Sequence, residues 1–200
     1  MKDLKRSTRV LKSTLNTAFW IMLAGGVFAA GYHIHELYRL FTDPTTLSGE
    51  MVLTIDYLTI RSAESFGMGL DAAASLRLVY LISSAAITVA ACLGIKALKR
   101  VLLPIENGQP FLEGISADIL ALGKCAFRLG LIENLSMLAT VILLERHAVL
   151  DVLLDSGAVT GIAVDPSFRP AWFIVAALLS VLAMVFRQGE QLQTLSDETL

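Results

Sequence analysis

The chain has few charged residues and almost no cysteine. Charged side chains make up 17% of its 200 residues against 55% hydrophobic ones, whereas a soluble globular domain is about one quarter charged. The two cysteines, Cys92 and Cys125, are too few for a disulfide framework or a cysteine-rich metal cluster. We interpret them as packing residues, since a redox pair would need the two thiols to meet across neighbouring helices. This composition argues against a soluble domain.

Motifs of the common enzyme classes are also missing. The sequence contains no nucleotide-binding phosphate loop, no nucleophile elbow and no zinc-protease motif. We therefore predict a protein that is not an enzyme and that uses no cofactor. His33, His35 and Glu36 resemble a metal site, but residues two apart diverge by roughly 200° on a helix. We interpret them as residues of the membrane interface, with metal binding as the minor alternative.

The chain is rich in long apolar runs. These runs comprise residues 16–37, 76–98, 125–144 and 170–186. A helix rises about 1.5 Å per residue, so about 20 residues cross a hydrocarbon core of roughly 30 Å, and an open sheet cannot satisfy its backbone in lipid. We predict an all-α membrane protein with a single four-helix transmembrane domain over residues 1–200. A cleaved signal peptide is the alternative for the first run, but its apolar stretch continues through Ile34, which favours an uncleaved anchor.

Basic residues predict how the spans are oriented. The cations near the first span and after the second are Lys2, Lys5, Arg6, Arg9, Lys12, Lys96, Lys99 and Arg100. Because short loops rich in Lys and Arg face the cytoplasm, we expect both termini to be cytoplasmic. The basic amino terminus also predicts contact with anionic lipids at the inner surface of the bilayer, and it favours this partner over direct binding of nucleic acid.

The first outer segment has a pattern of its own. Residues 51–60 are rich in β-branched side chains and alternate in the manner of a strand, so a short β-hairpin is plausible, with helix as the alternative. The following residues, 61–69, supply only a weak partner strand. Two prolines mark other boundaries: we expect Pro104 to end the second span and Pro170 to lie in the first turn of the fourth.

The third run carries the polar residues that point to a membrane site. Lys124 and Arg128 lie four residues apart on one helical face, and Glu133 and Asn134 follow. A carboxylate in lipid is costly unless it is paired or protonated, and Arg128 is poorly spaced for a pair within the helix. We expect Glu133 to take up a proton or to find a cation on another helix, either Arg187 or Lys96. The site would be a structural polar clamp or, alternatively, a proton relay or polar ligand site.

Two motifs lie on the predicted cytoplasmic side. The first is a turn after the second span that contains Gly108, Pro110 and Phe111, and the second is the exit from the last span, Phe186-Arg-Gln-Gly189-Glu-Gln-Leu. With these motifs the chain resembles bacterial membrane proteins of domain-of-unknown-function family 2975. The resemblance implies a small four-helix protein of the bacterial inner membrane with no assigned reaction.

The sequence is compatible with two functions. The first is a non-enzymatic membrane protein that acts by interaction, as a signalling, regulatory or immunity-type component, with a protein partner at the cytoplasmic face. It is favoured because the distinctive motifs are cytoplasmic and because the bundle lacks a run of central charges. The acidic amphipathic tail after Arg187 is either a solvated end or a segment that docks on a partner or on the basic amino terminus. The alternative is a small transporter or channel component that uses Glu133. It would require a homo-oligomer, since four helices rarely enclose a pore.

Overall fold

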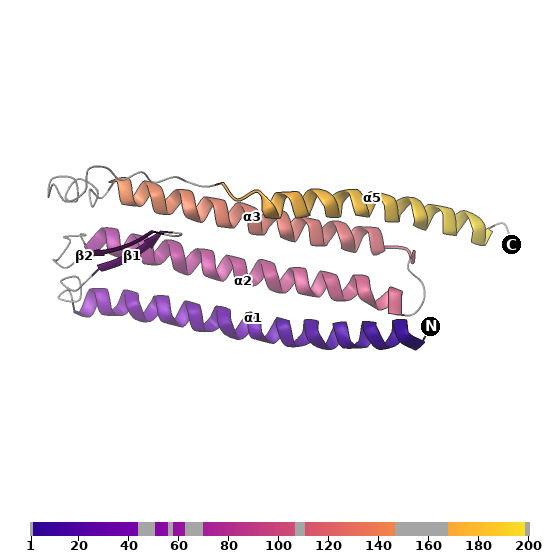
Figure 1. Cartoon of the computed structure of the whole chain (residues 1–200), viewed down its shortest axis with the longest axis horizontal. Helices are drawn as coiled ribbons and strands as arrows, with labels where there is room; N and C mark the ends of the chain where they lie inside the picture. Colours follow the sequence, from indigo (N-terminus) through magenta and orange to yellow (C-terminus); the bar gives the residue numbers. More distant parts are fainter. Residues whose placement is uncertain are drawn as a thin grey trace. The chain divides into compact units, whose positions relative to one another are not determined.

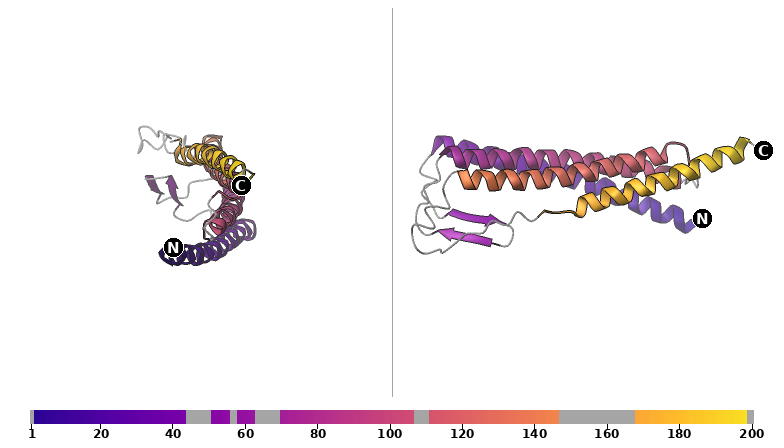
Figure 2. Two further views of the ribbon diagram at one scale, coloured as in Figure 1. Left: turned by 90° about the vertical axis from the view of Figure 1, so that its right-hand side faces the viewer. Right: turned by 90° about the horizontal axis from the view of Figure 1, so that it is seen from above.

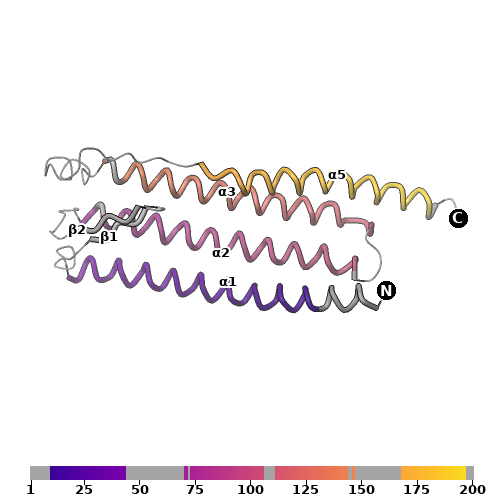
Figure 3. The backbone as a smooth tube through the Cα atoms, in the orientation of Figure 1, coloured from indigo at the N-terminus to yellow at the C-terminus, as the bar shows by residue number. Residues whose placement is uncertain are grey.

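The computed structural model of the chain describes residues 2–43, 51–55, 58–62, 70–106, 111–146 and 168–198. Its elements are labelled in Figure 1, and Figure 3 traces the same elements along the backbone. In chain order they are α1 (Lys2–Thr42), β1 (Met51–Ile55), β2 (Leu58–Ser62), α2 (Leu70–Glu106), α3 (Ile115–Arg146) and α5 (Ala171–Glu198).

The four helices are each long and apolar enough to cross a membrane. Their apolar segments are Val10–Thr42, Ala73–Ile105, Ile115–Leu143 and Ala171–Ser196. These segments overlap the four predicted runs, so the prediction of four helices with the length and apolar character of membrane spans is confirmed. The helices are also longer than the runs: the 41 residues of α1 extend for roughly 60 Å, about twice the thickness of a hydrocarbon core.

Strands β1 and β2 pair with each other in an antiparallel sheet of two strands. The register places Met51 opposite Ser62 and Ile55 opposite Leu58. Both strands contain β-branched residues, which pack better on a pleated strand than in a helix. They lie in the segment between the first two apolar runs, for which a hairpin and a helix were both possible from the sequence.

Contacts divide the chain into two compact units. The first unit contains residues 1–27, 85–133 and 169–200, and the second contains residues 28–84 and 134–168. The first therefore includes segments of α1, α2 and α3 together with the whole of α5, whereas the second includes segments of three helices and the hairpin. Within the first unit, α5 begins beside the middle of α3 (Figure 2). The single four-helix domain stays a prediction.

A buried cluster in the first unit joins three helices near the start of α3. Its buried members and the side chains packed around them are Val101, Ile115, Ile119, Ala183, Ile105, Leu179 and Phe186. Ile115, the first residue of α3, is only 2% exposed. Because α2, α3 and α5 all contribute, this cluster fixes the ends of the helices that carry the two sequence motifs.

Glycines allow helices of the first unit to approach closely. A Cβ atom on Gly26 of α1 would overlap the side chain of Thr88 of α2. A Cβ on Gly123 of α3 would lie 3.4 Å from the carbonyl oxygen of Ala176 in α5. Lipid provides no hydrophobic drive for helices to associate, so van der Waals contact at such small residues contributes much of the packing energy.

The two prolines lie at other places relative to the helix ends than the sequence predicted. Helix α2 continues through Pro104 to Glu106, because a missing N–H in the last turn removes only one helical hydrogen bond. Pro170 lies one residue before α5, where its carbonyl oxygen accepts hydrogen bonds from the amides of Phe173 at 2.9 Å and Ile174 at 3.0 Å. Pro170 thus begins the hydrogen-bond pattern of α5 from outside the helix.

Candidate functional site

Glu133, the carboxylate singled out in the third run, forms an ion pair. Its Oε1 accepts a hydrogen bond from Nη1 of Arg169 at 2.7 Å. The side chain of Glu133 is 29% exposed and that of Arg169 is 49% exposed. The sequence analysis expected Arg187 or Lys96 as the cation. Arg169 takes that place because α5 begins level with the middle of α3.

The start of α5 is held against α3 by close packing. Gly130 lies one turn before Glu133, and a Cβ there would meet Cβ of Trp172 at 3.0 Å. The rings of Phe127 and Phe173 pack edge to face, with their centroids 5.3 Å apart. These contacts bring the first turn of α5 close enough for Arg169, just before it, to reach the carboxylate.

The other predicted members of the membrane site do not gather around Glu133. Lys124, Arg128 and Arg187 are exposed, and Asn134 is half-buried. Among the described residues, Glu133 forms its ion pair with Arg169 and not with Lys124, Arg128 or Arg187. The arrangement is therefore a paired carboxylate between α3 and the start of α5.

The two sequence motifs meet in space at the start of α3. A Cβ on Gly189 would lie only 2.5 Å from Cδ1 and 2.7 Å from Cε1 of Phe111. The rings of Phe111 and Phe186 also contact each other, with centroids 5.5 Å apart. Gly108 and Pro110 lie outside the described residues. We call the contact of Phe111 with Phe186 and Gly189, together with the Ser116–Glu190 contact below, the motif joint.

Glu190 caps the first turn of α3. The backbone N–H of Ser116 donates to Oε1 of Glu190 at 2.7 Å, and Oγ of Ser116 donates to Oε2 at 2.8 Å. The first amides of a helix have no partner within the helix, and a carboxylate there also interacts favourably with the helix dipole. Sequence reasoning missed this role because the acceptor is 74 positions away; its only signal was a carboxylate next to Gly189.

Glu190→Ala should lower the free energy of unfolding by about 1–2 kcal/mol, because it leaves the first turn of α3 without an acceptor. The measurement is thermal or denaturant unfolding of the purified protein in detergent. Gln191→Ala is the matched control, since Gln191 is the exposed neighbour on the same helix. Equal stability of the two variants would show that Glu190 does not cap α3.

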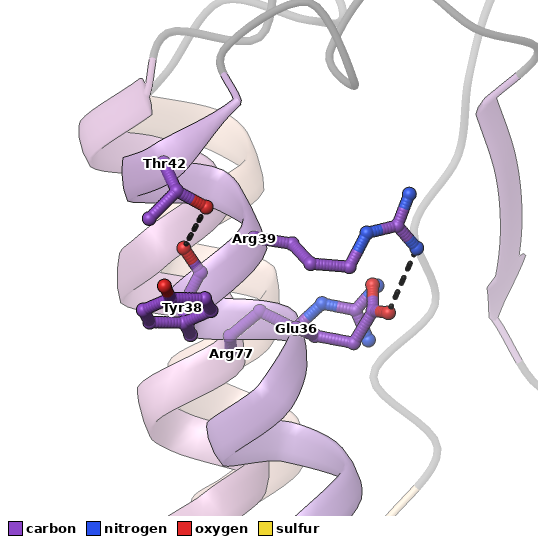
Figure 4. A network of polar contacts seen from close by, with 5 residues as sticks. All are labelled: Glu36, Tyr38, Arg39, Thr42 and Arg77. Atoms are coloured by element: carbon purple, nitrogen blue, oxygen red, sulfur yellow. Dashed lines mark hydrogen bonds and ion pairs between the residues drawn. The ribbon is translucent and has the colours of Figure 1, made fainter.

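A second polar network lies in the second unit, near the end of α1. The carboxylate of Glu36 interacts with Nη2 of Arg77 at 3.3 Å and with Nη1 of Arg39 at 3.5 Å. Figure 4 shows Glu36 reached by both arginines, with Thr42 donating a hydrogen bond to the carbonyl oxygen of Tyr38 close by. The network ties α1 to α2, because Arg77 belongs to α2.

His33 packs against two tyrosine rings in this region. Its imidazole stacks on Tyr80 at 6.0 Å between centroids and meets Tyr32 edge to face at 5.5 Å. Its Nδ1 is buried without a hydrogen-bond partner. Glu36 is engaged by the two arginines and His35 is exposed. Among the described residues, no three His, Cys, Asp or Glu side chains are placed to hold a metal ion.

The two cysteines are free thiols. Cys125 is buried in α3, where its Cβ would lie 3.7 Å from a Cβ added to Gly94, and Cys92 is half-buried in α2. This position fits the interpretation of Cys125 as a small packing residue at the contact of α2 with α3.

Known proteins provide no further assignment for these sites. Comparisons of the chain with family models, with curated proteins and with solved structures gave no match. The resemblance to family 2975 therefore stays a prediction from the two motifs.

Proposed function

We propose that the chain is a non-enzymatic protein of the bacterial cytoplasmic membrane that acts by binding another protein at its cytoplasmic face, as a signalling, regulatory or immunity-type component. In this proposal both termini lie in the cytoplasm and the hairpin of β1 and β2 lies on the outer side. The distribution of Lys and Arg around the spans supports this orientation.

The observation that carries the proposal is the way α5 continues past the motif joint. The joint holds the exit of α5 against the start of α3, and α5 then runs on to Glu198. On this extension Leu192 is 69% exposed and Leu195 is 59% exposed. Residues three apart lie on one side of a helix, and a pair of exposed leucines there is the kind of face that a partner groove buries.

The pairing of Glu133 supports this function over transport. A carboxylate in a span that already has an arginine at 2.7 Å has the arrangement of a structural polar clamp, with the two charges paired to each other. A proton relay or ion path would need further titratable groups around the carboxylate. Lys124 and Arg128, the cations of the predicted site on the same helix, are exposed instead.

Leu192→Glu combined with Leu195→Glu should strongly weaken partner binding. The test places a photo-crosslinking amino acid at Gln188 in intact cells and follows the crosslinked product. We expect about a tenfold loss of that product, because truncating a central apolar contact typically costs more than 1 kcal/mol. Removing residues 188–200 would be a poorer test, since it would also remove Gly189 and Glu190 from the motif joint.

The matched control is Gln191→Glu combined with Gln193→Glu, which adds the same charge to exposed positions of the same segment. It should leave the crosslinked product unchanged. A product that survives in the leucine variant, or that is lost equally in both variants, would contradict binding through the leucine pair.

A further inference from the structure

Two lysines of α2 converge on one aromatic ring of α1 in the first unit. Nζ of Lys96 lies 5.5 Å from the ring centroid of Phe19, and Nζ of Lys99 lies 5.3 Å from the same centroid. Lys99 also donates a hydrogen bond to Oδ1 of Asn16 at 3.0 Å. The four side chains are three positions apart on each helix, so they face one another across the contact of α1 with α2.

In the part of the chain that the structure describes, no carboxylate pairs with Lys96 or Lys99. Their contacts there are with the ring of Phe19 and with the amide oxygen of Asn16. The next cation, Arg100, is already paired with Asp118 at 2.8 Å. A cation over an aromatic ring gains about 0.5–1 kcal/mol at an exposed site but keeps its full charge. The cluster therefore favours an anion.

The cluster lies where both helices change from polar to apolar. On α1, Asn16 and Thr17 directly precede the apolar stretch that begins at Ala18, and on α2 the apolar stretch of residues 85–95 ends immediately before Lys96. In a membrane this boundary falls at the depth of the lipid headgroups. Trp20, packed edge to face on Phe19 and 59% exposed, is a typical residue of that depth.

We propose that Lys96, Lys99, Asn16 and Phe19 form a binding site for the phosphate of an anionic phospholipid. The two ammonium groups neutralise the negative charge of the phosphate, and the free hydrogens of the Asn16 amide donate to phosphate oxygens. Phe19 and Trp20, the aromatic pair, cover the apolar part of the lipid. This site is separate from the general attraction of the basic residues 1–12 to the membrane surface, because it is built between two helices. It does not depend on a protein partner.

The experiment uses the full chain in nanodiscs. The unfolding midpoint is measured in discs of phosphatidylcholine alone and with increasing phosphatidylglycerol, and bound lipids are counted by native mass spectrometry. Phosphatidylglycerol should raise the midpoint and remain bound. In the double variant Lys96→Gln and Lys99→Gln, lipid affinity should fall by about tenfold or more, since each basic residue near an anionic surface contributes about 1 kcal/mol.

The control for charge is the double variant Lys124→Gln and Arg128→Gln, which removes two exposed cations from α3. It should keep the specific lipid shift. Equal losses in the two double variants would overturn the site in favour of general electrostatic attraction. Phe19→Leu keeps every charge but removes the ring, and it should weaken lipid binding several-fold. If the lysine double variant does not fold, the single variant Lys96→Gln, at an exposed position, provides the same test.

Inorganic phosphate added to phosphatidylcholine discs distinguishes the source of the phosphate. It should produce no shift, because it lacks the apolar part that the aromatic pair covers. A shift as large as that of phosphatidylglycerol would overturn a lipid as the ligand, and the absence of any shift with phosphatidylglycerol would overturn the site itself.

Discussion

Replacing Gly189 with leucine is expected to lower the free energy of unfolding by about 1–3 kcal/mol, the usual penalty for overpacking. Any side chain at this position begins with a Cβ only 2.5 Å from the ring of Phe111. The ring has to leave its place, and its contact with Phe186 is lost with it. Unfolding of the purified protein in detergent, followed by circular dichroism, measures the effect.

Gly25→Leu is the matched control for this substitution. Gly25 also lies in a helix of the first unit, but a Cβ there has no atom within 4 Å. Leucine has the higher helix propensity by about 0.8–1 kcal/mol, so this variant should be as stable as the parent or slightly more stable. Phe111→Ala should restore part of the stability of Gly189→Leu by vacating the space. If Gly189→Leu were as stable as Gly25→Leu, the motif joint would contribute nothing to stability.

The second large effect is expected at the ion pair of α3 with the start of α5. Arg169→Gln leaves the partly buried carboxylate of Glu133 without its cation, which should destabilise the protein by about 1–3 kcal/mol. Adding Glu133→Gln to that variant removes the stranded charge. The double variant should therefore be more stable than Arg169→Gln alone, and the cycle of four proteins gives the coupling energy of the pair.

Unfolding of the four proteins in the same detergent provides the measurement. Arg187→Gln controls for the loss of a nearby cation, because Arg187 lies on α5, the helix that Arg169 precedes, and is exposed, and it should change stability little. Strictly additive effects of the Glu133 and Arg169 substitutions would disprove an energetic link between them. They would leave Glu133 available for the transport function that the sequence also allowed.

The helical spans could be predicted from the sequence because their signal is local. Each run is long enough for lipid and contains few charges, and no distant contact is needed to make such a segment helical. The ends of the helices were harder to predict. Pro104 predicted a stop, yet α2 continues to Glu106, because the packing of Val101 and Ile105 around the buried cluster outweighs one missing hydrogen bond in the last turn.

The partner of Glu133 could not be predicted because it depends on how α5 aligns with α3. From the sequence, Glu133 would either take up a proton or pair with a cation on another helix, and the two candidates were Arg187 and Lys96. Arg169, directly before the fourth apolar run, was not among them. It becomes the partner only because Trp172 and Phe173 pack against Gly130, which places the beginning of α5 beside the middle of α3. That alignment is a tertiary property.

The contacts of the motif joint could not be predicted from the sequence for the same reason. Phe111 and Gly189 were both recognised as motif residues, yet nothing in their spacing revealed that a ring of one motif fills the place of a side chain in the other. Glu190 was present in the second motif as an ordinary acidic residue. Its role as a cap appears only when the start of α3 and the exit of α5 are brought together.

The Ser116–Glu190 contact also has a place in the order in which contacts can form while the chain is synthesised. Arg100 and Asp118 are 18 positions apart, so their ion pair can form as soon as α3 follows α2 out of the ribosome. The cap on α3 spans 74 positions and has to wait until most of α5 has been translated. In a nascent chain the first turn of α3 is therefore made before its cap, and Glu190 completes that turn only after α5 follows.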